Sequence, residues 1–575
     1  MTSTDSTGTR FSNGLARKTC GLSVAIALAF GASAVAHAGD VETHHVRETV
    51  HSNLAQQVGS LPAAKLMSLD VVLPLRDKAG LDAFVADVTN PNSLNYQNYL
   101  TPQQFTAQFG PTQNDYDTVV QYLQRYGFTV TGGSRDGMDI QVIGPVSAVE
   151  AAFNVTMRTY RHPTENRTFY SPDREPTTSL AIPLWHISGL DNYSIPKPLY
   201  VKKSDYAAAH GISPDQVVSH ATTGSGPSAS FLGSDMRAAY YGGTALNGKG
   251  QNLGLLEYYG TDLADLNTYY KNVKQTNKVP VTLLSTDGTS TACVASSGCD
   301  DTEQTLDMTQ ALGMAPGLAS LVMYVGSTDT AIISKMTTHS PLPTTIGCSW
   351  GWTPADPTTL DPYFEKMAAQ GQTFFAASGD SSTWSASNEA WPADDAYVIS
   401  VGGTDLTTTK AAGPWKSETA WVDGGGGISP DSIAIPSWQK IAGVINTSNK
   451  GSTKYRNGPD VSANANFTFY VCADQTTCTA NNYGGTSFAA PMWAGFVALI
   501  NQQRVADGKK RVGSFNATVY PENESGGKLT TTYTTDFHDI TSGTSGSYSA
   551  VKGYDLVTGW GSPKAGLITT LANSP

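Results

Sequence analysis

Apolar positions in residues 39–200 follow two different periods, one typical of strands and one typical of helices. Strands are predicted at Leu69–Leu73, Phe128–Thr131 and Met138–Ile143. Helices are predicted at Ala79–Val88, around Tyr116, Val119, Val120 and Leu123, and around Val149, Ala152 and Phe153. This alternation of strands and helices indicates an α+β, ferredoxin-like module over residues 39–201.

Residues 229–575 show a second kind of alternation, in which short buried-strand patterns are separated by helical patterns. The apolar runs are Leu253–Leu256, Leu321–Val325, Thr373–Ala377 and Val398–Val401. Such a sequence predicts an α/β domain with a parallel sheet flanked by helices. Between the two domains, residues 202–228 have little periodicity and many small polar residues. They predict an exposed linker, the kind of segment in which proteolysis occurs.

The N-terminal residues 1–38 have the pattern of a secretory signal peptide. Basic residues precede an apolar run from Leu22 to Val35, and Ala36-His37-Ala38 supplies a cleavage site of small residues. An N-terminal membrane anchor is the alternative, but the apolar run is short for a bilayer. The other segments do not reach spanning length, so the sequence predicts a soluble, secreted protein without a membrane partner.

Charge and cysteine content narrow the class of protein further. The net charge of -12 argues against nucleic acid or anionic membrane as a partner. Two pairs of cysteines, Cys293 with Cys299 and Cys472 with Cys478, have the same spacing and predict two small disulfide loops in an oxidising compartment. Cys348 lies in an apolar strand pattern, where a buried thiol is favoured over a nucleophile.

A candidate nucleophile, Ser487, lies in the segment Gly484-Gly485-Thr486-Ser487-Phe488-Ala489-Ala490-Pro491. The segment resembles the Gly-Thr-Ser-x-x-x-Pro turn that places the nucleophile of subtilisin-fold peptidases at a helix N-terminus. A serine hydroxyl needs a base to remove its proton. Only His339 and His538 lie within residues 229–575, and a structural role is favoured for both over the role of base.

Carboxylates offer another base. Glu303 and Asp307 are four residues apart, so a helix would place them on one face. Two neighbouring carboxylates share a proton and one pKa rises, which makes Glu303 a candidate base oriented by Asp307; a solvated surface pair is the alternative. Asp380 follows a buried strand pattern, and the active sites of parallel sheets lie at the C-terminal ends of such strands. An Asx turn after the strand would also explain an aspartate at this position.

Together these segments resemble the sedolisins, the serine-carboxyl peptidases that include kumamolisin. The shared motifs are Leu100-Thr101-Pro102-x-x-Phe105, Phe109-Gly110-Pro111, Val149–Phe153, Gly189–Asn192, Glu303-x-x-x-Asp307, Ser349-Trp350-Gly351, Ser378-Gly379-Asp380, Val401–Thr404, Pro436–Gln439 and Pro459–Ser462. The resemblance implies Ser487 as nucleophile, Glu303 as general base and acid with Asp307 as its partner, and a protonated Asp380 as oxyanion donor. Glu257 and Trp350 occupy positions that extend this network in kumamolisins.

The same resemblance implies one structural Ca²⁺ near the C-terminus. The matching ligand positions are Asp539, Ile540, Val551, Gly553 and Asp555, with Val551 at a position where the family usually has glycine. Two carboxylates and backbone carbonyls suit this hard cation. Two unrelated loop aspartates are the alternative interpretation.

The sequence therefore predicts a secreted zymogen, an acid-acting serine-carboxyl endopeptidase that acts on proteins or peptides as a monomer. Its domains are a signal peptide (1–38), an activation prodomain (39–201), a linker with the self-cleavage site (202–228) and a peptidase domain with the calcium site (229–575). The prodomain is expected to be an intramolecular inhibitor and chaperone. The rival hypotheses are a Ser-His-Asp subtilisin-like protease and an exported binding protein that has the fold without activity.

Overall fold

The structure is a computed structural model and describes residues 39–217, 223–388, 390–475 and 477–575. The predicted signal peptide, with Cys20, lies outside the described residues. Among the described residues, no helix is long and apolar enough to cross a membrane.

The N-terminal module has the predicted ferredoxin-like order. Its antiparallel sheet has the strand order β3-β4-β2-β7, with strands at Leu66–Val72 (β2), Thr129–Ser134 (β3), Asp139–Pro145 (β4) and His186–Ser188 (β7). Helices α4 (Gln113–Arg125) and α5 (Val146–Phe153) follow β2 and β4, and the hairpin β5–β6 (Met157–Arg161, Thr168–Pro172) precedes β7. The chain thus runs β-α-β-β-α-β through this sheet, which confirms the prediction.

Two further helices, α2 (Lys78–Val88) and α3 (Pro102–Gln108), lie between β2 and α4 in the chain. Side-chain caps stabilise the N-terminus of each helix. The Asp77 side chain accepts a hydrogen bond from the Gly80 amide at the start of α2. Thr101 and Gln104 form a reciprocal capping box at the start of α3. Apolar residues on one face of α2, including Leu81, are buried.

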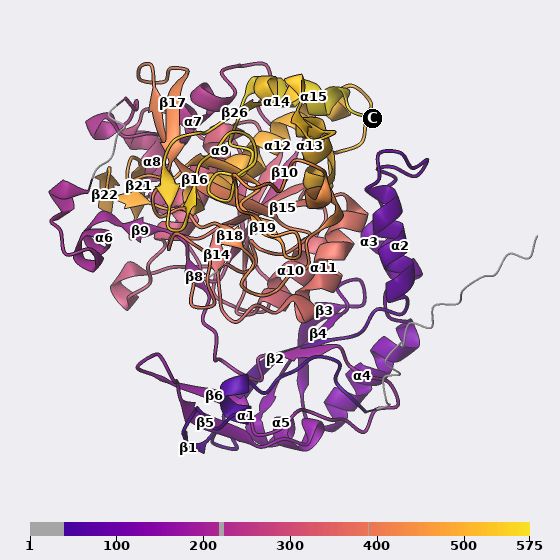
Figure 1. Cartoon of the computed structure of the whole chain (residues 1–575). Helices are drawn as coiled ribbons and strands as arrows, with labels where there is room; N and C mark the ends of the chain where they lie inside the picture. The colour runs from indigo at the N-terminus through magenta and orange to yellow at the C-terminus, as the bar shows by residue number, and fades with distance from the viewer. Residues whose placement is uncertain (1–38, 218–222, 389, 476) are drawn as a thin grey trace, which may run out of the picture. The chain divides into compact units, whose positions relative to one another are not determined.

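Residues 229–575 contain an eight-stranded sheet with the order β11-β12-β10-β13-β15-β16-β17, in which β20 also pairs with β16. Its strands are Asn252–Glu257 (β10), Val281–Ser285 (β11), Ser320–Val325 (β12), Thr345–Cys348 (β13), Thr373–Ala377 (β15), Ile399–Thr408 (β16), Trp415–Ala420 (β17) and Val461–Asn464 (β20). Only the β16–β17 pair is antiparallel among these pairings. In Figure 1 the strands of the N-terminal sheet are indigo to purple and those of this sheet run from magenta to orange, so separate stretches of chain build the two sheets.

Both faces of the large sheet are covered, because successive strand residues alternate between two cores. In β12, Met323 joins the core that contains helices α9 (Thr302–Met314) and α12 (Ala489–Ala506). Its neighbour Tyr324 joins the core that contains α10 (Asp329–Thr338) and α11 (Pro357–Gln370). This arrangement confirms the predicted parallel sheet flanked by helices.

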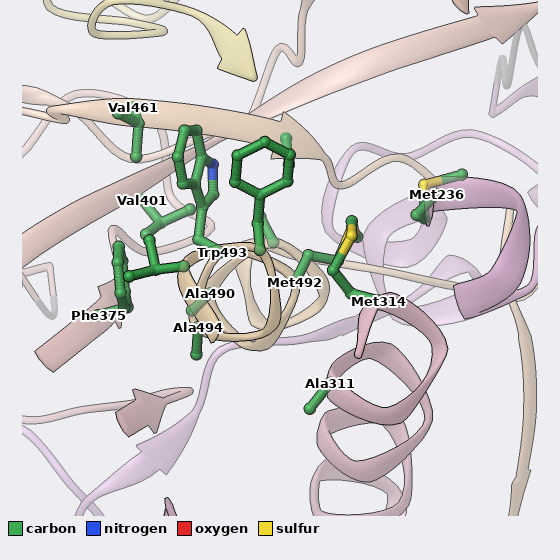
Figure 2. Close-up of a cluster of buried hydrophobic side chains, with 14 of the residues drawn as sticks. Met236, Ala311, Met314, Phe375, Val401, Val461, Ala490, Met492, Trp493 and Ala494 are labelled. Carbon is green, nitrogen blue, oxygen red and sulfur yellow. The ribbon is translucent and has the colours of Figure 1, made fainter. Parts of the chain in front are cut away.

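Helix α12 is buried along most of its length and connects the sheet to α9. Figure 2 shows Trp493 of α12 facing the side where Val401 and Val461 of the sheet lie, with Met492 on the side of Met314 from α9. Because α12 and α9 pack directly on each other, residues at their N-termini are held at fixed positions.

The N-terminal module packs on α10 and α11 through polar contacts, one buried and one partly exposed. The hydroxyl of Thr330 donates to Asp70 Oδ2 over 2.7 Å, and Lys78 pairs with Glu365 over 2.8 Å. Burial raises the pKa of Asp70 well above its ordinary value, with the charge of Asp139 acting in the same direction.

The segment that the sequence assigns to a linker is more regular than its composition indicates. Residues Lys203–Ala209 form helix α6 and Pro214–Gln216 form a short 3-10 helix. Burial of Ala207 and Val217 against Trp421 and Phe467 explains the difference, since tertiary contacts order a segment of weak propensity.

The cysteines are arranged as predicted. Cys293 is bonded to Cys299 and Cys472 to Cys478. Cys348 is a fully buried free thiol, and burial raises its pKa. A buried thiol with a raised pKa is a poor nucleophile, which agrees with the structural role expected of it.

Candidate active site

Ser487 lies where strand β23 (Tyr483–Gly484) turns into the 3-10 helix Thr486–Phe488 and then into α12. The side chain is fully buried. Its hydroxyl donates to Glu303 Oε2 over 2.9 Å and lies 3.3 Å from the carbonyl oxygen of Ser349. The residue predicted as nucleophile therefore contacts the residue predicted as base.

Glu303 and Asp307 project from the first two turns of α9 and are buried. The Ser349 hydroxyl donates to Asp307 Oδ1 over 2.7 Å. Glu303 Oε1 and Asp307 Oδ2 are buried without a hydrogen-bond donor, a situation that one proton shared by the two carboxyls would relieve. Burial, followed by the charges of Asp307 and Glu257, raises the pKa of Glu303 well above its ordinary value, and burial raises the pKa of Asp307 to about 8. A solvated surface pair is excluded by this burial.

Glu257 and Trp350 extend the carboxyl cluster as the resemblance implies. The indole Nε1 of Trp350 donates to Glu257 Oε2 over 3.0 Å, and both side chains are buried. Burial and then the charge of Asp307 raise the pKa of Glu257, while the indole hydrogen bond lowers it. Three carboxyls thus share a site that is closed to water.

Asp380 approaches Ser487 from the end of strand β15. Its Oδ1 accepts from the Thr486 amide over 2.7 Å and from the Thr486 hydroxyl over 2.8 Å. Its Oδ2 is buried without a donor and lies 2.7 Å from the place that a Cβ on Gly485 would occupy. Gly485 has a φ of 140°, so both its conformation and the space beside it require glycine. Burial raises the pKa of Asp380 to about 8, which favours the neutral acid able to donate from Oδ2.

The two histidines are engaged elsewhere. His339 Nδ1 lies 2.7 Å from the hydroxyl of Tyr324, and the ring of His538 stacks on Trp415 with centroids 4.0 Å apart. Burial lowers the pKa of both, that of His538 to about 3. This geometry fits the structural role expected of them and gives the Ser-His-Asp hypothesis no support.

The sequence interpretation missed the roles of Ser349 and Thr486. Ser349 directly follows β13 and contacts both Asp307 and Ser487, and Thr486 fixes Asp380. For Ser349 the available signal was its position just after a strand of the parallel sheet, because side chains from such ends meet at one edge, whereas Thr486 follows β23 of a separate antiparallel pair.

The structure brings the predicted calcium ligands together in two pairs, on either side of the hairpin β27–β28 (Thr544–Ser545, Tyr548–Ser549). Asp539 Oδ1 accepts from the Gly553 amide over 3.0 Å, and Asp555 Oδ2 accepts from the Val551 amide over 2.9 Å. Ile540 and Asp555 are buried. The backbone at Val551 lies outside the left-handed region, so the loss of the usual glycine causes no strain there. Within the described residues, no group of three or more His, Cys, Asp or Glu side chains could hold a metal, so a site here would depend on backbone carbonyls.

Comparisons with known proteins match both parts of the chain. A model of the pro-kumamolisin activation domain matches residues 53–193, and a model of the subtilase family matches residues 250–546. Kumamolisin from Bacillus sp. (strain MN-32) is 30% identical over 542 residues, which cover 88% of this chain and 92% of the relative. Sedolisin from Pseudomonas sp. (strain 101) is 27% identical over 591 residues, covering 94% and 93%. A solved structure of Pseudomonas sedolisin, a serine-carboxyl proteinase, complexed with two molecules of pseudo-iodotyrostatin has 25% identity and a TM-score of 0.47, covering 59% of this chain and 96% of that chain.

A subtilase-type catalytic domain behind an activation domain defines the class as a serine-type peptidase with its own prodomain. Within that class the chain belongs to the sedolisin family, as its similarity to kumamolisin over most of both chains shows.

Proposed function

We propose that this protein is a secreted, acid-acting serine-carboxyl endopeptidase that is made as a self-processing zymogen. The observation that carries the proposal is the 2.9 Å hydrogen bond from the Ser487 hydroxyl to Glu303 inside a buried carboxyl cluster. Two disulfides support export, because they persist in oxidising compartments.

The geometry supports a specific division of roles. A proton held between Glu303 Oε1 and Asp307 Oδ2 would leave Glu303 Oε2 free to accept the Ser487 proton as the hydroxyl attacks a substrate carbonyl. Glu303 then returns that proton to the leaving amine. Ser349 orients Asp307 through its 2.7 Å hydrogen bond.

Negative charge on the attacked carbonyl oxygen needs donors, and two are available. The Ser487 amide is one, and a neutral Asp380 would be the other through Oδ2. An ionised Asp380 could only accept hydrogen bonds and would repel the developing oxyanion. The proposed chemistry therefore requires Asp380 in its protonated form.

Hydrolysis is expected to be fastest at acid pH, where Asp380 is protonated and one proton is shared by Glu303 and Asp307. The pKa of Asp380 is raised, so its donor proton is present at low pH and is lost as the pH rises through that pKa. Because burial is the first cause of the shift, exposure of Asp380 to water in the unoccupied site would lower this pKa and move the loss of activity towards the acid range.

This pH dependence is tested by kcat/KM profiles of the wild type, Asp380→Asn and Asp380→Ala. The amide of Asn donates at every pH, so its profile should lack the fall on the alkaline side. The Ala variant should lose about 10²–10³ in rate at the acid optimum. A wild-type optimum at neutral or alkaline pH, as a histidine base gives, would contradict the proposal.

The proposal includes one calcium ion in the segment from Asp539 to Asp555, on the chemistry of its oxygen ligands. Carboxyl oxygens of Asp539 and Asp555 and backbone carbonyls of Ile540, Val551 and Gly553 would hold the ion, since hard cations prefer oxygen ligands. Asp555 is buried and its carboxylate accepts from the Val551, Val557 and Thr558 amides, and a bound cation would add the countercharge that these neutral donors do not supply. Calcium here would fix the loop and take no part in hydrolysis.

Calcium removal should lower the stability of the mature enzyme more than its kcat. At a calcium concentration 100 times the Kd, the loss is about 2.7 kcal/mol of unfolding free energy. Thermal unfolding with EGTA and after calcium is restored measures the effect, and Asp539→Asn should abolish the calcium-dependent difference. Equal melting temperatures of the wild type in calcium and in chelator would exclude the site.

A further inference from the structure

The chain itself occupies the candidate active site. Residues Lys197–Pro198 (β8) pair antiparallel with Trp350–Gly351 (β14), and Val201–Lys202 (β9) pair antiparallel with Tyr483–Gly484 (β23). Extended peptides that bind proteases add a strand in the same manner, through backbone hydrogen bonds. Between the two strands lies the peptide bond from Leu199 to Tyr200.

The Leu199 carbonyl has the surroundings of a bond about to be cut. Its oxygen accepts from the Ser487 amide over 3.0 Å, and the Leu199 amide donates to the Ser349 carbonyl over 2.9 Å. A Cβ atom on Gly485 would lie 2.6 Å from the Leu199 oxygen and 2.7 Å from Asp380 Oδ2, so both oxygens are close to the same point. The Leu199 oxygen therefore accepts from one of the two proposed oxyanion donors and lies on the same side of Gly485 as the other.

Side chains on either side of this bond have defined partners. Leu199 is buried and lines a small cavity with Ser378, Gly379, Trp384 and Gly425. On the other side, the Tyr200 hydroxyl and the Lys202 ammonium both lie 3.3 Å from Asp300 Oδ2, and the Tyr200 ring packs edge-on against Tyr483.

Asp300 is held in place by its surroundings. Its Oδ1 accepts from the Thr302 amide at the start of α9, and it directly follows Cys299 of one disulfide loop. Gln475 of the other disulfide loop donates to the Cys293 carbonyl over 2.7 Å, so the two loops brace each other. A carboxylate that contacts the side chains at 200 and 202 can distinguish substrates by hydroxyl and positive charge.

We infer that the protein cuts its own chain between Leu199 and Tyr200, and that Asp300 is a specificity residue that selects a tyrosine and a lysine, one and three residues after the cut bond. The inference rests on the proposed function and moves the cut from residues 202–228 to the boundary before β9. Ser487 Oγ forms an ester with the Leu199 carbonyl carbon, and its proton passes through Glu303 to the Tyr200 nitrogen as the peptide bond breaks. Water then adds to the ester, which gives the Leu199 carboxyl group and restores the Ser487 hydroxyl.

The first test follows the earliest cut after the purified zymogen is acidified. N-terminal sequencing and mass spectrometry should find Tyr200 as the first new N-terminus, with a first-order rate that is unchanged by tenfold dilution. Leu199→Asp places a carboxylate in the small cavity and should slow this cut at least about 100-fold. Ile212→Asp, a matched change in an exposed residue of the linker, should leave it unchanged.

A first N-terminus at any other residue, or equal processing of both variants, would overturn the inference. Hydrolysis of casein by the acidified wild type distinguishes failure of this inference from failure of the proposed function. If casein is hydrolysed while the first cut falls elsewhere, the inference fails and the proposed function stands. If neither occurs at acid pH, the proposed function fails as well.

The second test measures the selectivity assigned to Asp300. A synthetic peptide of residues 195–204 should be cut between Leu199 and Tyr200 by the mature enzyme. Asp300→Asn should lower kcat/KM for this peptide about two- to fivefold, the size of an exposed ion pair, but should not change kcat/KM for a peptide with Ala at both 200 and 202. Equal losses on both peptides would show that Asp300 only maintains the structure and would overturn its role in specificity.

Discussion

Ser487→Ala should abolish both peptide hydrolysis and release of the N-terminal module at about pH 3–5. The loss in kcat should be on the order of 10⁶, the size found when the nucleophile of a subtilisin-type site is removed. The reason is that Glu303 and the oxyanion donors can act only on a bond that the serine oxygen attacks. Hydrolysis of a fluorogenic peptide and gel analysis after acidification measure the two effects.

Loss of folding must be separated from loss of chemistry in this variant. The change removes one hydroxyl that donates to Glu303, which should cost about 1 kcal/mol, and the melting temperature should fall only slightly. A trace of active wild-type enzyme should restore release of the N-terminal module if the variant zymogen is folded. Normal self-processing of Ser487→Ala without added enzyme would refute Ser487 as the nucleophile.

The sequence predicted most of the framework because its signals are local. Periodicity located the strands and helices, and i,i+4 spacing brought Glu303 and Asp307 to one helix face, as α9 shows. Identical cysteine spacing predicted both disulfides. Each of these inferences depends on residues close together in the chain.

Features that depend on long-range contacts were not predicted. Composition indicated an irregular linker, but burial of Val217 in a cluster with Phe467 orders this region. Strand β9 also pairs with residues far along the chain. The contact of Ser349 with Asp307 joins the end of one strand to a distant helix, and spacing carries no information about it. Pairing of residues 197–202 with strands on both sides of Ser487 likewise depends on contacts between distant parts of the chain.

Glu303→Gln should lower kcat by about 10⁴, the upper end of general acid–base catalysis, because the amide has nearly the same shape and cannot accept the serine proton. Since this variant cannot process itself, its catalytic domain is released with a trace of wild-type enzyme that is then removed by affinity tag. Stopped-time peptide assays at acid pH measure the residual rate. The melting temperature of the variant should stay close to that of the wild type, because Gln also relieves the repulsion between Glu303 and Asp307.

Three matched variants decide which group is the base. Glu257→Gln keeps the acceptor for the Trp350 indole and changes a buried carboxyl that does not touch Ser487, so its loss should be far smaller than that of Glu303→Gln. His339→Gln and His538→Gln should keep wild-type kcat, since both rings are bound to other aromatic residues. If either histidine variant lost activity as Glu303→Gln does while still folded, histidine would have to be part of the mechanism. If only Glu303→Gln loses activity, the proton of Ser487 passes to a carboxylate. The same carboxyl groups that activate the serine then restrict the enzyme to acid pH, because one of them must stay protonated.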